Sequence, residues 1–379
     1  MIISNKEITE GLKFYPFIKK DFDKYENLND GYYHILTDLL LYPRAWAYFV
    51  YSKRGPGKTY GALWFCYYNK IKFIYMKRTN KDVNLILQNN SPEFDASPYK
   101  KLKMDKHINV VGVKEDEGIG AYYTANNEGE PKELLCYVLS FNEVQAYKGF
   151  DFSDCEFIIF DEVIPQKGER VKKSEGENLL DLYMTVSRDR QKRGKRPLKL
   201  LMFANAEEIS TPVTNELEII DDLADLNASN KPCMLTKRNI LLHHITNEEV
   251  PIKEEEMEGI YEGMMGTAWW EKAFGGYFSG NDFTNVTKRS IKRAKPLIHI
   301  MYRTSHYYIY FNEEKDRYYM CSVPSRCAYE YNLNRENEQK KFYFDFQIDL
   351  MDACIDERMK FEKYSMYDLI SNYKKFFKI

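Results

Sequence analysis

The chain has 379 residues, 44% of them hydrophobic and 30% charged, which is enough for two or three domains with a full-sized core. Its formal net charge of -2 excludes a globally basic nucleic-acid-binding protein, so any basic site must be local. Seven cysteines without a Cys-x-x-Cys pair and six histidines without metal-ligand spacing argue against a disulfide framework or a zinc site.

In chain order, the N-terminus lacks the apolar core of a signal peptide, and no stretch is long enough to cross a bilayer. We therefore expect no membrane contact and a cytoplasmic protein. The first half then alternates strand-like and helix-like patterns, which predicts an α/β layer with a mostly parallel sheet. The predicted strands are residues 47–51, 72–77, 134–141, 156–160 and 198–204, and residues 115–131 are predicted to form an exposed hairpin or loop.

A glycine-bearing loop follows the first predicted strand and precedes a helix-capable stretch. Its glycines allow backbone N–H groups to surround phosphate oxygens, as in a Walker A loop, with a lysine on the β and γ oxygens and a threonine on Mg²⁺. Serine stands where the first glycine of this pattern usually lies, and a basic surface turn is the structural alternative. The candidate residues are Ser52, Lys53, Arg54, Gly55, Pro56, Gly57, Lys58, Thr59 and Tyr60, of which Lys53 is expected to face solvent.

Asp161 and Glu162 lie at the end of the apolar strand predicted at 156–160. One carboxylate at such a strand end can hold Mg²⁺, and a second can polarise water as a general base. We assign Asp161 to the metal and Glu162 to the base. Because further predicted strands separate this pair from the glycine-bearing loop, the pattern favours the additional-strand, catalytic-glutamate class of P-loop ATPase over small kinases.

Other polar residues are candidates for the same chemistry. Asn205 ends the next predicted strand and could sense a phosphate or orient water, although in isolation a strand-ending asparagine in a turn is the simpler explanation. The basic run from Arg188 to Arg196 could supply an arginine finger to a neighbouring subunit, contact a nucleic-acid backbone, or form a solvated helix end. Arg188 is the candidate finger, and Lys148 is a candidate basic contact at a subunit boundary.

Two assignments stay open at this point. Residues 77–81 would either face the channel of a ring-shaped assembly or form a capped helix start. For the adenine pocket the sequence offers only Tyr42 and Tyr60.

The composition changes after about residue 226. Residues 246–264 are strongly acidic, as a solvated helix face is, and residues 275–281 are glycine-rich. Three short strands are then predicted at 297–303, 306–311 and 317–323, followed by helices at 346–361 and 366–377. We therefore predict a P-loop domain over 1–226, a linker subdomain over 227–292 and a small α+β domain over 293–379.

In their order and spacing these motifs resemble the DNA-packaging ATPases of phi-29-like podoviruses, which are relatives of large terminase subunits. The resemblance covers most of the first 210 residues, and beyond them only the layout is similar. The Arg-x-Arg pair and Ala-Asn-Ala are more discriminating than the generic motifs. The stretches that carry the resemblance are residues 54–60, 73–78, 139–140, 159–164, 179–190 and 204–206.

The resemblance implies a homo-oligomeric ring, usually a pentamer, that hydrolyses ATP and drives double-stranded DNA through the portal of a prohead in the host cytoplasm. A scaffold RNA is kept open as a further partner. Carried over by position, Lys58 and Thr59 bind phosphate and Mg²⁺, Asp161 holds the metal and Glu162 is the base. Arg54 lies in the phosphate loop, and Asn205 is the coupling or sensor residue. Arg188 is the finger acting in trans, and Lys148 is a second basic residue acting across the subunit boundary.

Large terminases end in a ribonuclease-H-like nuclease, and the resemblance makes the 293–379 domain a vestigial copy of it. Such nucleases need clustered carboxylates for two metals, one of them from the first strand, and residues 297–303 contain none. We therefore expect no DNA cleavage, and docking to the portal or to a scaffold nucleic acid instead.

Two other functions stay open. One is a different ring-forming P-loop translocase, such as a helicase, and the other is a nucleotide-dependent binding switch with little turnover. Glu162 and Arg188 argue against the switch, because a switch needs neither a general base nor a finger.

Overall fold

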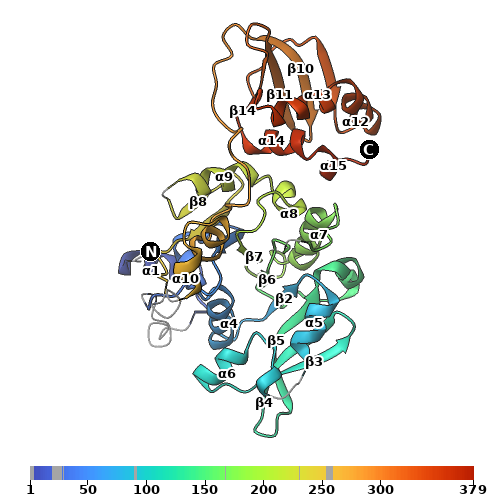
Figure 1. Ribbon diagram of the computed structural model, residues 1–379. Helices are drawn as coiled ribbons and strands as arrows, with labels where there is room; N and C mark the ends of the chain where they lie inside the picture. Colours follow the sequence, from blue (N-terminus) through green and yellow to red (C-terminus); the bar gives the residue numbers. More distant parts are fainter. Residues whose placement is uncertain are drawn as a thin grey trace. The chain divides into compact units, whose positions relative to one another are not determined.

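The computed structural model of the protein describes residues 4–18, 28, 30–88, 92–166, 168–229, 231–252 and 259–379. The chain forms two compact units, Met1–Gly280 and Asn281–Ile379 (Figure 1). The division into three parts at residues 226 and 292 stays a prediction.

Within the described residues of the first unit, nine strands form one sheet. They are β1 Ala47–Ser52, β2 Phe73–Lys77, β3 Val110–Asp116, β4 Ile119–Ala125, β5 Pro131–Ser140, β6 Phe157–Asp161, β7 Lys199–Asn205, β8 Cys233–Leu235 and β9 Ile240–Ile245. Their order across the sheet is β3-β4-β5-β2-β6-β7-β1-β9-β8. The strands from β5 to β9 in this order are parallel, whereas β3, β4 and β8 pair antiparallel at the two edges. The predicted α/β class with a mostly parallel sheet is therefore confirmed.

Helices cover this sheet because its central strands are apolar on both faces; every residue of β1 and of β9 is buried. The helices are α1 Asn5–Leu12, α3 Ile35–Leu41, α4 Lys58–Tyr68, α5 Asn80–Leu87, α6 Lys100–Lys106, α7 Glu175–Ser187, α8 Pro212–Glu216, α9 Ile220–Ala228, α10 Ile260–Met264 and α11 Ala268–Trp270. Short turns of other helix types, η1 Pro92–Phe94, η2 Phe141–Gly149 and η4 Glu271–Gly275, lie between them.

One face of the sheet packs on α3, α4, α5 and α6 in a single apolar core. Among the described helices, none combines the length and the apolar character that crossing a bilayer requires.

The segment 115–131 has the antiparallel hairpin structure that was predicted, with exposed turns, but it is not exposed throughout. It contains the strand β4, in which Ala121 and Tyr122 are buried. The apolar run of β4 is short and lies between glycine, glutamate and asparagine residues, so its period-2 pattern is hard to detect in the sequence.

The second unit has a five-stranded sheet in the order β13-β10-β11-β12-β14. Strands β10 to β12 form the predicted antiparallel meander, while β13 and β14 lie parallel to β10 and β12. The elements are β10 Lys295–Tyr302, β11 Ser305–Asn312, β12 Arg317–Cys321, β13 Tyr329–Asn332, α12 Glu336–Phe342, η5 Tyr343–Gln347, α13 Ile348–Ile355, β14 Met359–Phe361, α14 Tyr364–Ser371 and α15 Tyr373–Phe376.

The prediction of one helix over 346–361 is wrong in its second part. Helix α13 ends at Ile355, and Glu357 has a φ of 56°, a left-handed conformation that a helix interior does not tolerate. The chain therefore turns and enters the sheet as β14.

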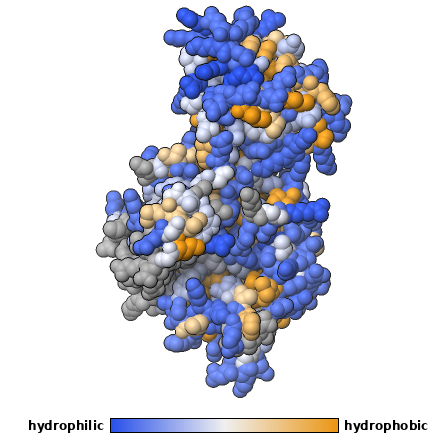
Figure 2. All heavy atoms as spheres, in the orientation of Figure 1, coloured by the Kyte–Doolittle hydropathy of each residue, from blue (hydrophilic) through white to orange (hydrophobic). Residues whose placement is uncertain are grey.

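The surface of each unit is largely hydrophilic on the face drawn in Figure 2, with small apolar groups between the charged side chains. In the second unit, the exposed apolar side chains include Phe344, Ile348 and Ile355.

Arg78, directly after β2, holds together the elements that flank the carboxylate-bearing strand. Its guanidinium donates to the Val163 carbonyl at 3.0 Å and to Glu175 Oε2 at 2.6 Å, and lies 3.4 Å from Glu169. The Arg78 and Glu175 side chains are only 6% and 3% exposed. Because Val163 follows β6 and Glu175 begins α7, this arginine fixes α7 to the end of β6.

Replacing Arg78 by methionine should lower the free energy of unfolding by about 3–5 kcal/mol, because Glu175 would stay buried without its partner. Urea denaturation followed by circular dichroism measures this. The matched control is Lys72→Met, whose pair with Asp154 has side chains 43% and 38% exposed and should contribute only about 0–1 kcal/mol. Equal unfolding midpoints for the two variants would contradict the assignment.

Candidate functional site

The loop between β1 and α4 has the backbone of an anion cradle. Gly55 and Gly57 have φ of 91° and 97°, a region that residues with side chains rarely adopt. Gly57 caps α4, so Lys58 is the first residue of that helix. The Tyr33 amide donates to the Pro56 carbonyl at 2.9 Å and so supports the loop from outside. A helix N-terminus behind such a loop attracts phosphate.

Lys58 is buried behind this loop, and its ammonium donates to Ser52 Oγ and, at 3.3 Å, to the Lys53 carbonyl. Burial lowers the pKa of Lys58 to about 8, although Asp161 and Glu162 favour its charge. The serine that replaces the usual glycine therefore has a role, because its hydroxyl orients the lysine.

The expectation that Lys53 faces solvent is wrong. Lys53 is 5% exposed, because Gly276 comes so close to the backbone of Ser52 and Lys53 that a side chain at 276 would collide with it. Arg54, the next residue, is exposed.

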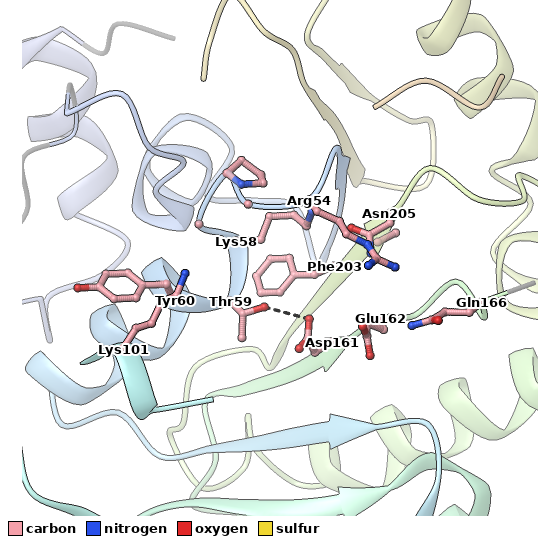
Figure 3. Close-up of a pocket in the computed structure, with 14 residues that line it drawn as sticks. Arg54, Lys58, Thr59, Tyr60, Lys101, Asp161, Glu162, Gln166, Phe203 and Asn205 are labelled. Atoms are coloured by element: carbon pink, nitrogen blue, oxygen red, sulfur yellow. Dashed lines mark hydrogen bonds between the residues drawn. The ribbon is translucent and has the colours of Figure 1, made fainter. Parts of the chain in front are cut away.

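Two carboxylates stand at the end of β6, opposite the loop. Thr59 Oγ1 donates to Asp161 Oδ1 at 2.9 Å (Figure 3). The Tyr75 hydroxyl donates to Asp161 Oδ2 at 2.7 Å. Lys77 Nζ lies 2.6 Å from Glu162 Oε2 and 3.3 Å from Asp161 Oδ2. Glu162 has a φ of 60°, a strained conformation for a residue with a side chain and one that clusters at functional sites.

The charges at this end of the sheet are balanced. Burial opposes the charge of Lys77, but Asp161 and Glu162 outweigh it, so the pKa of Lys77 is raised. Burial, and then the Asp161 carboxylate, raise the pKa of Tyr75 well above its ordinary value. Lys77 therefore stays protonated and Tyr75 stays a hydrogen-bond donor.

Sequence reasoning gave Lys77 and Tyr75 no place in this site. Of the two alternatives for residues 77–81, the capped helix start is observed, since Thr79 and Asp82 form a capping box on α5. The signal for Lys77 was its position at the end of a predicted parallel strand, the same edge at which the carboxylates lie.

A cavity of about 360 Å³ opens between the loop and the carboxylates (Figure 3). Phe203, Gln166 and Lys101 line it without having been predicted. Its full lining is Arg54, Gly55, Pro56, Gly57, Lys58, Thr59, Tyr60, Lys101, Asp161, Glu162, Gln166, Phe203, Ala204 and Asn205.

Asn205 ends β7 and pairs in register with Ser52 of β1, which places it beside the loop. Of the two tyrosines considered for the adenine pocket, Tyr60 lines the cavity and Tyr42 does not. The Tyr42 carbonyl instead accepts from the Tyr48 hydroxyl at 2.8 Å.

The two oxygen-bearing side chains predicted to hold a metal, those of Thr59 and Asp161, lie next to each other. The Thr59 hydroxyl and the Asp161 carboxylate are within hydrogen-bond distance of each other, and hydroxyl and carboxylate oxygens are the donors that a hard cation such as Mg²⁺ takes. The residues present therefore fit Mg²⁺.

Arg188 lies apart from this cavity. It caps the C-terminus of α7 and is exposed, and among the residues that the structure describes no hydrogen bond or ion pair engages its guanidinium. The side chain of Lys148, in η2, lies outside the described part of the chain.

The basic run after α7 is more than a solvated helix end, because Arg190 is buried. Its guanidinium donates to the Arg196 carbonyl at 2.7 Å, to the carbonyls of Cys155 and Ser153 at 2.5 and 3.3 Å, and to Glu156 Oε2 at 2.9 Å. Arg190 thus fixes the chain two residues beyond Arg188.

A glycine-rich loop after a central parallel strand, and a carboxylate pair ending a strand two places away in the sheet, give the first unit the arrangement of a P-loop α/β domain. No family model and no curated protein sequence matches the chain.

Solved structures are similar to it over nearly the whole length. The phi-28 gp11 DNA packaging motor covers 92% of this chain and 98% of its own, with 15% identity and a TM-score of 0.56. The bacteriophage phi-29 viral genome packaging motor assembly covers 91% and 99%, with 17% identity and a TM-score of 0.59. The ATPase domain of a Thermus phage large terminase matches 70% of this chain and 98% of its own length at 11% identity, and its TM-score of 0.36 is too low to indicate a shared fold. The chain thus has the fold of the phi-28 and phi-29 packaging motor proteins, and the resemblance found in the sequence is confirmed at the level of fold.

The lowered pKa of Lys58 predicts that Mg·ATP binding takes up a proton near pH 8.5 and much less near pH 7. With a pKa of about 8, part of Lys58 is neutral at the higher pH, and phosphate oxygens favour its ammonium form. Isothermal titration calorimetry in two buffers of different ionisation enthalpy measures the uptake. Lys58→Arg is the control, because a guanidinium stays protonated at both pH values. Equal uptake by the unaltered chain at the two pH values would show that Lys58 is already fully charged.

Proposed function

We propose that this chain is the ATPase of a viral DNA-packaging motor, which hydrolyses ATP to move double-stranded DNA into a preformed capsid through its portal. The observation that carries the proposal is the Thr59–Asp161 hydrogen bond with Glu162 beside it, on a fold shared with packaging motor proteins. The position of β7 between β1 and β6 supports the additional-strand, catalytic-glutamate class.

In this proposal the backbone N–H groups of Gly55, Gly57, Lys58 and Thr59 and the Lys58 ammonium hold the β- and γ-phosphates of ATP. Thr59 and Asp161 hold Mg²⁺, which when bound neutralises charge on the phosphate oxygens. Glu162 orients the attacking water and accepts its proton at a carboxylate oxygen.

Neighbouring side chains prepare these groups. Lys77 fixes the Glu162 carboxylate at 2.6 Å, and the Tyr75 hydroxyl fixes Asp161. Asn205, at the cavity wall beside the loop, senses the γ-phosphate or orients water. Arg54, also in the wall, is a further cation for the phosphates.

We propose that Arg188 acts in trans, in a homo-oligomeric ring that is usually a pentamer in similar motors. Its exposure, its distance from the lining of its own cavity and the rigid attachment of the chain at Arg190 support this role. Lys148 is proposed as a second basic residue across the same boundary. The ring would assemble on the prohead in the host cytoplasm, with a scaffold RNA kept open as a partner.

The last part of the chain is proposed to be a vestigial ribonuclease-H-like domain over 293–379, joined by a linker subdomain over 227–292. The meander with β13 parallel to β10 supports the first assignment, and β10 presents buried Ile298 and Ile300 but no carboxylate. Such a domain would dock on the portal or on a scaffold RNA without cleaving DNA.

The proposal is tested by measuring ATP hydrolysis with and without double-stranded DNA and empty portal-bearing capsids of the same virus. We expect both to stimulate hydrolysis, the DNA to become protected from added nuclease, and the DNA to stay uncut in Mg²⁺ or Mn²⁺. Glu162→Gln should abolish hydrolysis and protection together. Strand separation without protection would indicate a helicase, and nucleotide binding without turnover would indicate a switch.

Removing the finger, in Arg188→Ala, should lower the rate of hydrolysis about 10³- to 10⁵-fold while nucleotide binding persists. Mixtures of Arg188→Ala and Glu162→Gln subunits should regain part of the activity, because one kind of mixed boundary carries both intact groups. Lys192→Ala, an exposed lysine of the same run, is the matched control and should change little. A role in trans is excluded if mixed rings form and no activity returns.

A further inference from the structure

Helix α6 is attached firmly to the side of the P-loop helix α4. Tyr99 and Leu102, before and within its first turn, are fully buried in the apolar core that α4 shares. Near the other end of α6, Lys106 Nζ lies 5.1 Å from the centre of the Trp64 ring on α4. The backbone at the start of α6 therefore has a defined place relative to the loop.

The four lysines of α6 are not equivalent. Three are used within the fold: Lys100 donates to the Glu93 carbonyl at 3.3 Å, Lys103 to Asp95 Oδ2 at 3.2 Å, and Lys106 packs on Trp64. Lys101 instead lines the cavity at the phosphate loop. Within the described ranges no hydrogen bond or ion pair engages its ammonium, and the cavity's two carboxylates are those already held by Lys77.

Lys101 lies at one end of the cavity, together with Tyr60. Figure 3 shows these two side chains on the side of Thr59 away from Asp161 and Glu162. In the proposed function the γ-phosphate must lie next to Glu162, where water attacks. Because the three phosphates form a linear chain held at the loop, the α-phosphate and the nucleoside must then extend toward Tyr60 and Lys101.

We infer that Lys101, with Tyr60, binds the nucleoside monophosphate portion of the nucleotide, which hydrolysis leaves unchanged. The ammonium supplies a charge-assisted hydrogen bond to an α-phosphate, ribose or base oxygen or nitrogen, and the Tyr60 ring supplies an apolar surface beside it. This inference rests on the proposed function. Since the interaction is the same in ground state and transition state, it lowers KM and leaves kcat unchanged.

The test compares Lys101→Met with Lys100→Met, two neighbours on one helix of which only the first lines the cavity. Calorimetric titrations of the full chain use Mg·ADP and, separately, Mg·pyrophosphate, which carries no nucleoside. We expect Lys101→Met to weaken ADP about tenfold, with an equal rise in KM for ATP and an unchanged kcat, and to leave pyrophosphate binding unaltered. Lys100→Met should leave all of these values unchanged.

The possible results distinguish a failure of the role given to Lys101 from a failure of the proposed ATPase function. If the unaltered chain binds neither ADP nor pyrophosphate, the proposed function fails. If it binds both and Lys101→Met binds ADP as well as Lys100→Met does, only the role of Lys101 fails. A loss of pyrophosphate binding or of kcat in Lys101→Met would place the lysine on the transferred phosphates and overturn the inference as stated.

Discussion

The hydrogen bond from Thr59 to Asp161 joins the start of α4, which follows β1, to the end of β6, although β1 and β6 are not neighbours in the sheet. It can form because β7 lies between them, parallel to both, with Ser52 opposite Asn205 and Asp161 opposite Phe203. Parallel strands that begin at one edge also end at one edge, so loop, carboxylates and Asn205 converge there. A register slip of one residue would turn the side chains of a strand to the other face and separate the two oxygens.

The charges of the site are consistent with this buried position. Lys58 and Lys77 face Asp161 and Glu162, so the inner group has two cations and two carboxylates. Lys58 is buried, and the side chains of Lys77 and Asp161 are only 13% and 16% exposed, so the nearby opposite charges lower the cost of keeping these groups charged.

Much of this could be predicted from the sequence. The apolar runs before Ser52, Asp161 and Asn205 located the three central strands, because strands buried on both faces have no polar alternation. The glycines and the adjacent carboxylates located the cavity.

What the sequence did not reveal depends on contacts between distant segments. Lys101 lies in a stretch without a local motif, and only the packing of α6 on α4 brings it to the loop. Lys77 ends a predicted strand, but only the sheet order places it beside the carboxylates. Lys53 looks like a solvent-facing loop residue until Gly276, far along the chain, packs over its backbone. Glu357 has no composition signal, yet its left-handed backbone ends a helix that the pattern continues.

The contacts of Arg190 limit how far the backbone near Arg188 can move. Its guanidinium is held by Ser153, Cys155 and Glu156, all just before β6. The loop that follows α7 is therefore attached to the start of the strand that ends in the carboxylates. The side chain of Arg188, two residues away, can change its rotamer, but its backbone is held in place. In the proposed assembly, a neighbour that uses Arg188 would come into range by rotation of whole subunits rather than by the opening and closing of this loop.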